Sequence, residues 1–248
     1  MSESVLDTVE SVPRRTMTMF FLIDTSGSME GSKIGAVNSA MEDVMPIIGE
    51  ISENNPDAEI KIAVLDFSSE VKWLYDEPKT ANNFQWRDVD ADGLTSLGDA
   101  CLKLEEKLHK NSGYMKSASG SFAPTIILMS DGEPTDNYQV GLNKLKANNW
   151  FKAGLKFAIA IGDDANKDVL KEFTGSNEAI LTVHNTEALK KIIRMVSVTS
   201  SQIASTSTSS GDKSKQEQMN DTIQDQIDGM DGVDGANTSN PSDIDEWD

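Results

Sequence analysis

Hydroxyl and carboxylate side chains follow directly after an apolar run near the start of the chain. The stretch FFLIDTSGSMEG, residues 20–31, turns polar at Asp24 and then presents Thr25, Ser26 and Ser28. By themselves these residues are equally typical of a turn that ends a strand, where the serine hydroxyls would satisfy backbone donors. Residues elsewhere in the chain are needed to decide between a turn and a binding site.

Two further oxygen-bearing residues are expected to return to the same place. Thr95 lies in DADGLTSLGDA, directly before a predicted helix, and Asp131 ends the apolar run PTIILMSD. In open α/β sheets, ligands bind outside the carboxyl ends of the strands. Hydroxyl and carboxylate oxygens suit Mg²⁺, with Mn²⁺ or Ca²⁺ as alternatives, better than they suit zinc. The sequence therefore predicts a metal site formed by Asp24, Ser26, Ser28, Thr95 and Asp131.

This set of residues resembles the metal-ion-dependent adhesion site (MIDAS) of the von Willebrand factor A domain. The motif of that family is Asp-x-Ser-x-Ser, then a distant Thr and a distant Asp. It is matched in order by residues 24–28, by Thr95 and by Asp131. The neighbouring DTSGSMEG, GLTSLGDA and LMSDGEPTD look most like the cytoplasmic bacterial branch associated with tellurite resistance and stress signalling. The resemblance covers roughly residues 16–198.

The resemblance implies which residues would contact the ion directly and which would support them. In the family the hydroxyls contact the ion and the carboxylates act largely through water. Ser26, Ser28 and sometimes Thr95 would then be ligands, with Asp24 and Asp131 in support. Neutral oxygens leave a divalent ion strongly attractive to a further anion, so a Glu or Asp carboxylate of a partner protein could bind it. The implied function is a non-enzymatic adaptor in a bacterial stress-response or defence system, with a kinase or phosphatase as partner.

The alternative function is a phosphatase or hydrolase that uses Mg²⁺ or Mn²⁺ at the same site. His109 and His184 are expected at a helix end and near a strand end, away from the Asp24 loop. Cys101 lies on the apolar face of a predicted helix, which favours core packing. The chain shows no glycine-rich phosphate loop with its lysine and no Ser/His/Asp triad signature. A general base at Glu133 is the remaining route to an enzyme.

The apolar pattern predicts the elements that would hold this site. Continuous apolar runs predict six strands, and i, i+3, i+4 spacing predicts the helices between them. This combination indicates a doubly wound, Rossmann-like α/β fold with a mostly parallel sheet covered by helices on both faces. A short SSE link makes the third strand an antiparallel edge strand. The strands are expected at 16–24, 58–67, 71–76, 124–131, 155–164 and 178–185, and the helices at 32–52, 94–110, 140–154, 166–174 and 186–198.

Two local details follow from single residues. Pro46 is expected to kink the helix at 32–52 or to split it in two. Ser96 and Asp99 have the spacing of a capping box, which would leave the Thr95 hydroxyl free for a metal ion.

Composition divides the chain into a flexible lead at 1–15, a domain at 16–198 and a disordered tail at 199–248. The tail is first rich in Ser and Thr and then acidic, with eleven acids against two lysines in residues 211–248. Such a segment is expected to bury too little apolar surface to order itself. Ile244 and Trp247 in its DIDEWD sequence could form a docking motif for a partner protein, and the alternative is a purely solubilising tail.

The overall charge and the cysteine content exclude several classes of protein. The net charge of −19 argues against nucleic acid or an anionic membrane as the main partner. The single cysteine rules out an internal disulfide framework. We find no signal peptide and no apolar run near the length of about 20 residues that a membrane span requires. A cytoplasmic location is the default expectation.

Overall fold

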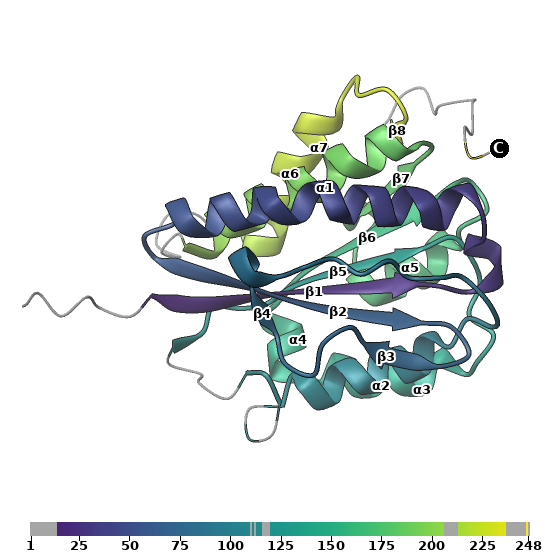
Figure 1. The fold of residues 1–248 in the computed structure, drawn as a ribbon, viewed down its shortest axis with the longest axis horizontal. Coiled ribbons are helices and arrows are strands. Elements are labelled where there is room, and N and C mark those ends of the chain that lie inside the picture. Colours follow the sequence, from purple (N-terminus) through teal and green to yellow (C-terminus); the bar gives the residue numbers. More distant parts are fainter. Residues whose placement is uncertain are drawn as a thin grey trace, which may run out of the picture.

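A central mixed sheet forms the middle layer of the molecule (Figure 1). The computed structural model describes residues 14–109, 111, 113–115, 120–205, 213–236 and 247. Its sheet has eight strands in the order β3-β2-β1-β5-β6-β7-β8, and β4 also pairs with β2. The strands are β1 Arg15–Asp24, β2 Ala58–Phe67, β3 Val71–Trp73, β4 Lys79–Thr80, β5 Thr125–Ser130, β6 Leu155–Ile161, β7 Ile180–Val183 and β8 Val233–Asp234.

Helices cover the sheet on both faces. Buried residues of α1, α6 and α7 belong to one apolar cluster, and buried residues of α2, α3, α4 and α5 belong to a second cluster on the opposite face. The helices are α1 Ser32–Asn54, α2 Leu97–Lys107, α3 Tyr138–Ala147, α4 Asn149–Ala153, α5 Lys167–Thr174, α6 Thr186–Ser205 and α7 Lys215–Ile227. Among the helices of the described residues, none has both the length and the apolarity needed to cross a bilayer.

Strand β1 lies at the centre and explains why its sequence is continuously apolar. Phe21 and Ile23 pack into the cluster under α1, while Phe20 and Leu22 pack into the cluster under α2. The strand pairs in parallel with β2 on one side and β5 on the other. Because these three strands are parallel, their carboxyl ends, and the connections that follow them, meet at one edge of the sheet.

The predicted fold class is confirmed, and the predicted number of strands needs a correction. The structure adds β4 and β8, which have two residues each. Antiparallel pairs join β2 to β3 and to β4 and join β7 to β8, so antiparallel strands lie at both edges of the sheet rather than at one. A two-residue strand is too short to produce a periodic pattern in a sequence.

Helix α1 runs through Pro46 as one element, so of the two expected outcomes the split into two pieces does not occur. Proline removes one backbone donor and leaves the carbonyl four residues earlier without its usual partner. Here both Pro46 and Glu42 are exposed, so water can reach that carbonyl.

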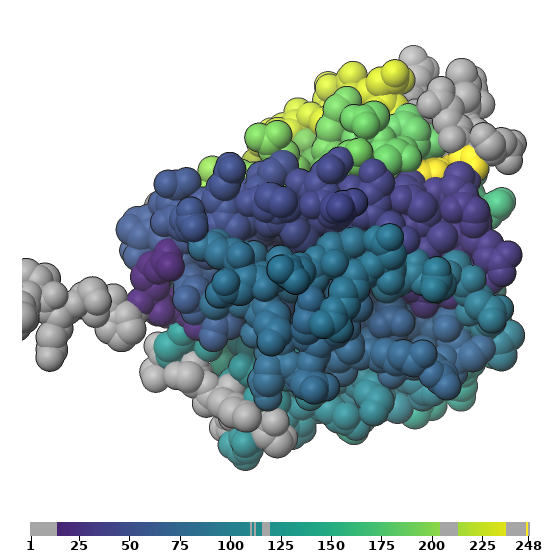
Figure 2. All heavy atoms as spheres, viewed as in Figure 1, coloured from purple at the N-terminus to yellow at the C-terminus, as the bar shows by residue number. Residues whose placement is uncertain are grey.

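The prediction of disorder at 199–248 needs correction for the described residues. Helix α6 continues to Ser205, and α7 begins at a capping box in which Ser214 and Glu217 bond reciprocally. Met219 and Ile223 on α7 are fully buried against the domain. Figure 2 shows the atoms of α7 and α6 joining those of α1 in one continuous surface. The segments 206–212, 237–246 and 248 lie outside the described residues.

The ends of the predicted domain also change. Arg14 and Arg15 are bound to backbone carbonyls of Ser52 and Ser121, and Arg15 begins β1, whereas residues 1–13 lie outside the described residues. At the other end, Trp247 is 7% exposed and belongs to the apolar cluster under α1. Trp247 is therefore packed against its own domain rather than displayed for a partner, while Ile244 lies outside the described residues.

The contact between α2 and α3 depends on glycine at position 141. A Cβ atom at Gly141 would lie 2.1 Å from the carbonyl oxygen of Gly98, whereas a Cβ atom at Gly35 in α1 would meet nothing within 4 Å. We expect Gly141→Ala to lower the free energy of unfolding by about 1–3 kcal/mol through overpacking. Gly35→Ala should raise it by about 0.5–1 kcal/mol because alanine loses less backbone entropy in a helix. Urea denaturation of both variants measures this difference, and equal effects would contradict the close contact.

The packing of α7 can be tested by removing one of its buried side chains. Ile223→Ala should lower the free energy of unfolding by about 2–5 kcal/mol, because it removes buried methyl groups and leaves a cavity. Gln226→Ala, at an exposed position on the same helix, is the matched control and should change stability by less than about 0.5 kcal/mol. If Ile223→Ala behaves like the control in chemical denaturation, the tail is not part of the fold.

Candidate metal centre

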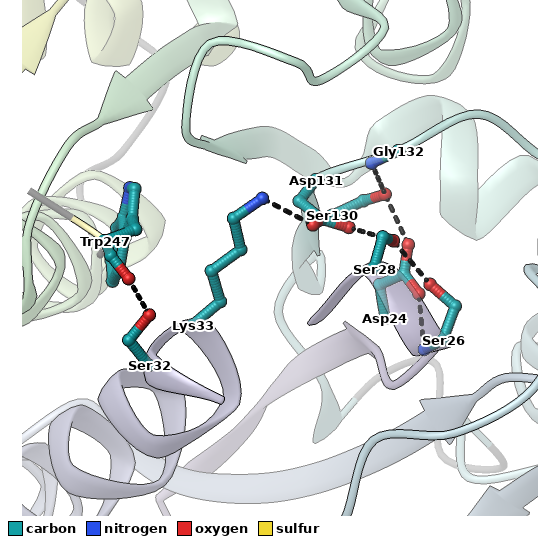
Figure 3. A network of polar contacts seen from close by, with 9 residues as sticks. All are labelled: Asp24, Ser26, Ser28, Ser32, Lys33, Ser130, Asp131, Gly132 and Trp247. Atoms are coloured by element: carbon teal, nitrogen blue, oxygen red, sulfur yellow. Dashed lines mark hydrogen bonds and ion pairs between the residues drawn. The ribbon is translucent and has the colours of Figure 1, made fainter. Parts of the chain in front are cut away.

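Asp24 is the last residue of β1, and both of its carboxylate oxygens are held in place. Its Oδ1 accepts a hydrogen bond of 2.9 Å from the backbone N–H of Ser26, and its Oδ2 accepts one of 2.6 Å from the hydroxyl of Ser130 (Figure 3). Asp24 has no exposed surface. Ser130 is the last residue of β5 and was not among the predicted site residues. It became part of the site because β1 and β5 are neighbours in register.

The serine hydroxyls form a continuous chain that leads to the second carboxylate. Ser26 Oγ lies 3.1 Å from Ser28 Oγ, and Ser28 Oγ donates a hydrogen bond of 2.7 Å to Asp131 Oδ1. A short 3₁₀ turn at Gly27–Met29 presents both hydroxyls. A Cβ atom at Gly132 would lie 3.3 Å from Ser28 Oγ, so the absence of a side chain at Gly132 leaves room for this approach.

Lys33 on the first turn of α1 forms an ion pair with Asp131 that the sequence analysis missed. Its Nζ lies 2.8 Å from Asp131 Oδ2, and the two side chains are 16% and 0% exposed. The preceding residue, Ser32, donates its hydroxyl hydrogen to the carbonyl oxygen of Trp247. The first turn of α1 therefore contacts both the candidate site and the end of the chain (Figure 3).

Thr95 reaches the same edge of the sheet through its backbone. It is buried, and its N–H donates a hydrogen bond of 3.0 Å to the hydroxyl of Thr135, in the connection that follows Asp131. The carbonyl oxygen of Thr25 accepts from the N–H of Asp92, which ties the Thr95 loop to the loop after β1. The structure thus joins Asp24, Ser26, Ser28 and Asp131 by hydrogen bonds and brings the loop of Thr95 beside them.

The predicted capping box at Ser96 and Asp99 is wrong. Ser96 occupies the N-cap position of α2, but its side chain makes no capping hydrogen bond. Instead Asp136 Oδ2 accepts from the N–H groups of Gly98 at 2.8 Å and Asp99 at 3.3 Å. A carboxylate binds such donors more strongly than a hydroxyl does, because the helix N-terminus carries partial positive charge. This contact also fixes the Asp131 connection onto α2.

The electrostatic state of the centre follows from burial. Removal from water raises the pKa of Asp24, hydrogen bonds from Ser130 and Ser26 oppose that rise, and the negative charge of Asp131 adds to it. Asp24, Asp131 and Lys33 together carry one excess negative charge. Hard oxygen atoms around excess negative charge fit a divalent cation such as Mg²⁺.

The composition of the centre differs from a carboxylate or thiolate cage. No cluster of three or more His, Cys, Asp or Glu side chains suitable for a metal occurs in the part of the chain that the structure describes. The candidate centre instead combines two carboxylates with serine hydroxyl groups.

The residues considered for enzymatic chemistry have other partners. His109 pairs with Glu105 at the end of α2, and buried His184 lies 2.9 Å from Asp234. Glu133 accepts a hydrogen bond from the side chain of Asn166. Cys101 is buried in the core, and burial raises the pKa of its thiol. Each of these contacts lies outside the network that joins Asp24 to Asp131.

Curated relatives match most of this chain but are far longer. Inter-alpha-trypsin inhibitor heavy chain H2 from Homo sapiens is 27% identical over 188 residues, which cover 70% of this chain and 18% of that protein. Heavy chain H6 from Homo sapiens is 27% identical over 181 residues, which cover 68% of this chain and 13% of that protein. The chain therefore spans less than a fifth of the length of either relative.

Solved structures show the same fold at low identity. Proximal thread matrix protein 1 from the mussel byssus has a TM-score of 0.56 at 19% identity, covering 73% of this chain and 47% of that chain. A structure of that protein with a zinc-occupied MIDAS motif has a TM-score of 0.55 at 18% identity, over 75% of this chain and 48% of that one. A von Willebrand factor type A protein from Catenulispora acidiphila has a TM-score of 0.55 at 15% identity, over 75% and 43%.

A protein-family model also matches most of the chain. It describes the von Willebrand factor type A domain and matches residues 19–195, which include every residue of the candidate centre. The chain belongs to the von Willebrand factor type A domain family.

Proposed function

We propose that this chain is a non-enzymatic module that binds a protein partner through a divalent cation. The observation that carries the proposal is the network of hydroxyl and carboxylate oxygens at the carboxyl edge of the sheet, buried at Asp24 and Asp131 and exposed at Ser28. Domains of this family bind protein partners through such a motif. The ion would be held by Asp24, Ser26, Ser28, Thr95 and Asp131.

The proposed ion is Mg²⁺, with Mn²⁺ or Ca²⁺ as alternatives. The donor atoms are hard oxygens, and Mg²⁺ keeps several waters that a carboxylate can replace. The zinc-occupied MIDAS motif of proximal thread matrix protein 1 supports a divalent ion at the corresponding motif. When bound, the ion would attract a Glu or Asp carboxylate of the partner. Ser26 and Ser28 would supply neutral hydroxyl oxygens to the ion.

We further propose the biological setting of this binding. The likeness of DTSGSMEG, GLTSLGDA and LMSDGEPTD to the tellurite-resistance branch supports a cytoplasmic adaptor in a bacterial stress-response or defence system. A kinase or a phosphatase is the proposed partner on the same grounds. The high net negative charge supports a protein partner rather than nucleic acid or an anionic membrane.

The hydrolase alternative gains no support from the geometry. A general base must reach the substrate proton directly or through one water. Glu133, the remaining candidate for that role, is hydrogen-bonded to Asn166. His184 is buried beside Asp234. We therefore keep the binding function as the conclusion.

Asp24→Asn tests the metal site without changing the shape of the side chain. Wild-type protein at a Mg²⁺ concentration 100 times its Kd should gain about 2.7 kcal/mol of stability, and the variant should gain none. With chelator at neutral pH the variant should be at least as stable as wild type. Burial raises the pKa of Asp24 above its ordinary value of 3.8, so the fold favours the protonated carboxyl group. The stabilisation that this group contributes is therefore present below pH 3.8 and is lost as the pH rises through the raised pKa. At neutral pH wild type no longer has that stabilisation.

Thermal and urea unfolding with Mg²⁺ and with chelator measure these effects. Asp66→Asn is the control, because Asp66 lies near the end of β2 at the same edge of the sheet but outside the motif. It should keep the Mg²⁺ response. A wild-type protein with no response to Mg²⁺ or Mn²⁺ would remove the metal site from the proposal.

Partner binding should depend on the ion and on a carboxylate. Wild-type protein should retain its partner in a pulldown with Mg²⁺ and lose it with chelator, whereas Asp24→Asn should fail in both conditions. Removing the contacting Glu or Asp of the captured partner should cost at least about tenfold in affinity, since charge-assisted contacts are worth about 1.5–3 kcal/mol. Capture that ignores both chelator and the Asp24 variant would show that another surface binds the partner.

A further inference from the structure

Lys33 is a charged residue of the candidate centre that lies outside the Asp-x-Ser-x-Ser, Thr and Asp motif. Its ammonium group bonds to the Asp131 oxygen that Ser28 does not use. The pair is shielded from water, since Asp131 has no exposed side-chain surface and Lys33 only 16%. A charge in such an environment acts strongly on its neighbours, because the local dielectric is lower than that of water.

The charges of the centre show what Lys33 changes. Two carboxylates and one ammonium group leave one excess negative charge. A divalent ion would convert this into one excess positive charge, and one partner carboxylate would then make the centre neutral. Without Lys33, the same ion would already neutralise the two carboxylates, and a partner carboxylate would add an uncompensated negative charge.

We propose that Lys33 lowers the affinity of the centre for the ion and raises the affinity of the ion-bound centre for the partner's carboxylate. It competes with the divalent ion for Asp131 and repels it, so it weakens ion binding. It also leaves the ion-bound centre positive, so it strengthens the attraction for a carboxylate. This inference rests on the proposed metal-dependent function and assigns Lys33 a role in partner specificity.

A purely structural role for Lys33 predicts a different outcome. If the ion pair only positions Asp131, its loss should disturb the oxygen network and weaken the binding of ion and carboxylate alike. The electrostatic role requires the two affinities to move in opposite directions. Opposite signs are therefore the diagnostic result.

The experiment uses Lys33→Gln in the full-length chain. Calorimetric titration with Mg²⁺ should show about tenfold tighter binding than in wild type, which corresponds to about 1.4 kcal/mol. Acetate then serves as the carboxylate probe on Mn²⁺-saturated protein, followed by water-proton relaxation. It should bind the variant at least about threefold more weakly, because the excess positive charge of the ion-bound centre is gone.

Three controls separate charge from shape and from general stability. Lys33→Arg keeps the charge and should stay close to wild type in both titrations. Lys190→Gln removes a lysine of another ion pair, 2.6 Å from Asp43, with 23% side-chain exposure, and should change neither affinity. Acetamide replaces acetate as a neutral probe and should not distinguish wild type from Lys33→Gln.

The outcomes distinguish this inference from the proposed function. Wild-type protein that binds neither Mg²⁺ nor Mn²⁺ would overturn the proposed function itself. The second case is a wild-type protein that binds the ion and a Lys33→Gln variant whose affinities for Mg²⁺ and acetate change in the same direction or not at all. That result would overturn only the role of Lys33. Tighter ion binding together with weaker acetate binding would support it.

Discussion

The candidate centre depends on the burial of two carboxylates at one edge of the sheet. Asp24 has no exposed surface and Asp131 almost none, and burial of a charged carboxylate is unfavourable unless hydrogen bonds or an opposite charge compensate. The structure provides both kinds of compensation. Ser130 and the N–H of Ser26 bind Asp24, while Ser28 and Lys33 bind Asp131. Both buried carboxylates of the centre are therefore compensated by neighbouring groups of the protein.

The parallel pairing of β1 and β5 places Asp24 and Asp131 close together. Strands β1 and β5 are aligned in register over Met19–Ile23 and Thr125–Met129, so Asp24 and Asp131 must follow at the same edge. Apolar side chains hold β1 from both faces, which leaves the strand ends little freedom to separate. The loops after the strands then approach closely, and Gly132 provides the room that Ser28 needs. Strand pairing and core packing thus position the oxygen atoms of the centre.

The sequence predicted those parts of the structure that leave a local pattern. The strand ends at Asp24 and Asp131 were predictable because an abrupt change from apolar to polar residues marks them. Lys33, Ser130 and Asp136 were not, because their roles depend on distances between elements far apart in the chain. Helix α7 was missed for another reason. The acidic composition of residues 211–248 concealed an apolar face of this helix, on which Met219, Ile223 and Ile227 recur every fourth residue.

The choice of serine at positions 26 and 28 bears on what the centre can do. Aspartate at either position would add negative charge and make a closed, self-sufficient cation site, which has little attraction left for an outside anion. Neutral hydroxyls supply oxygen atoms without charge, so a divalent ion held beside Lys33 would keep an excess positive charge. Such a centre would bind an ion less tightly than a carboxylate cage does. That weaker binding is the physical condition under which the ion can still hold a carboxylate from another protein.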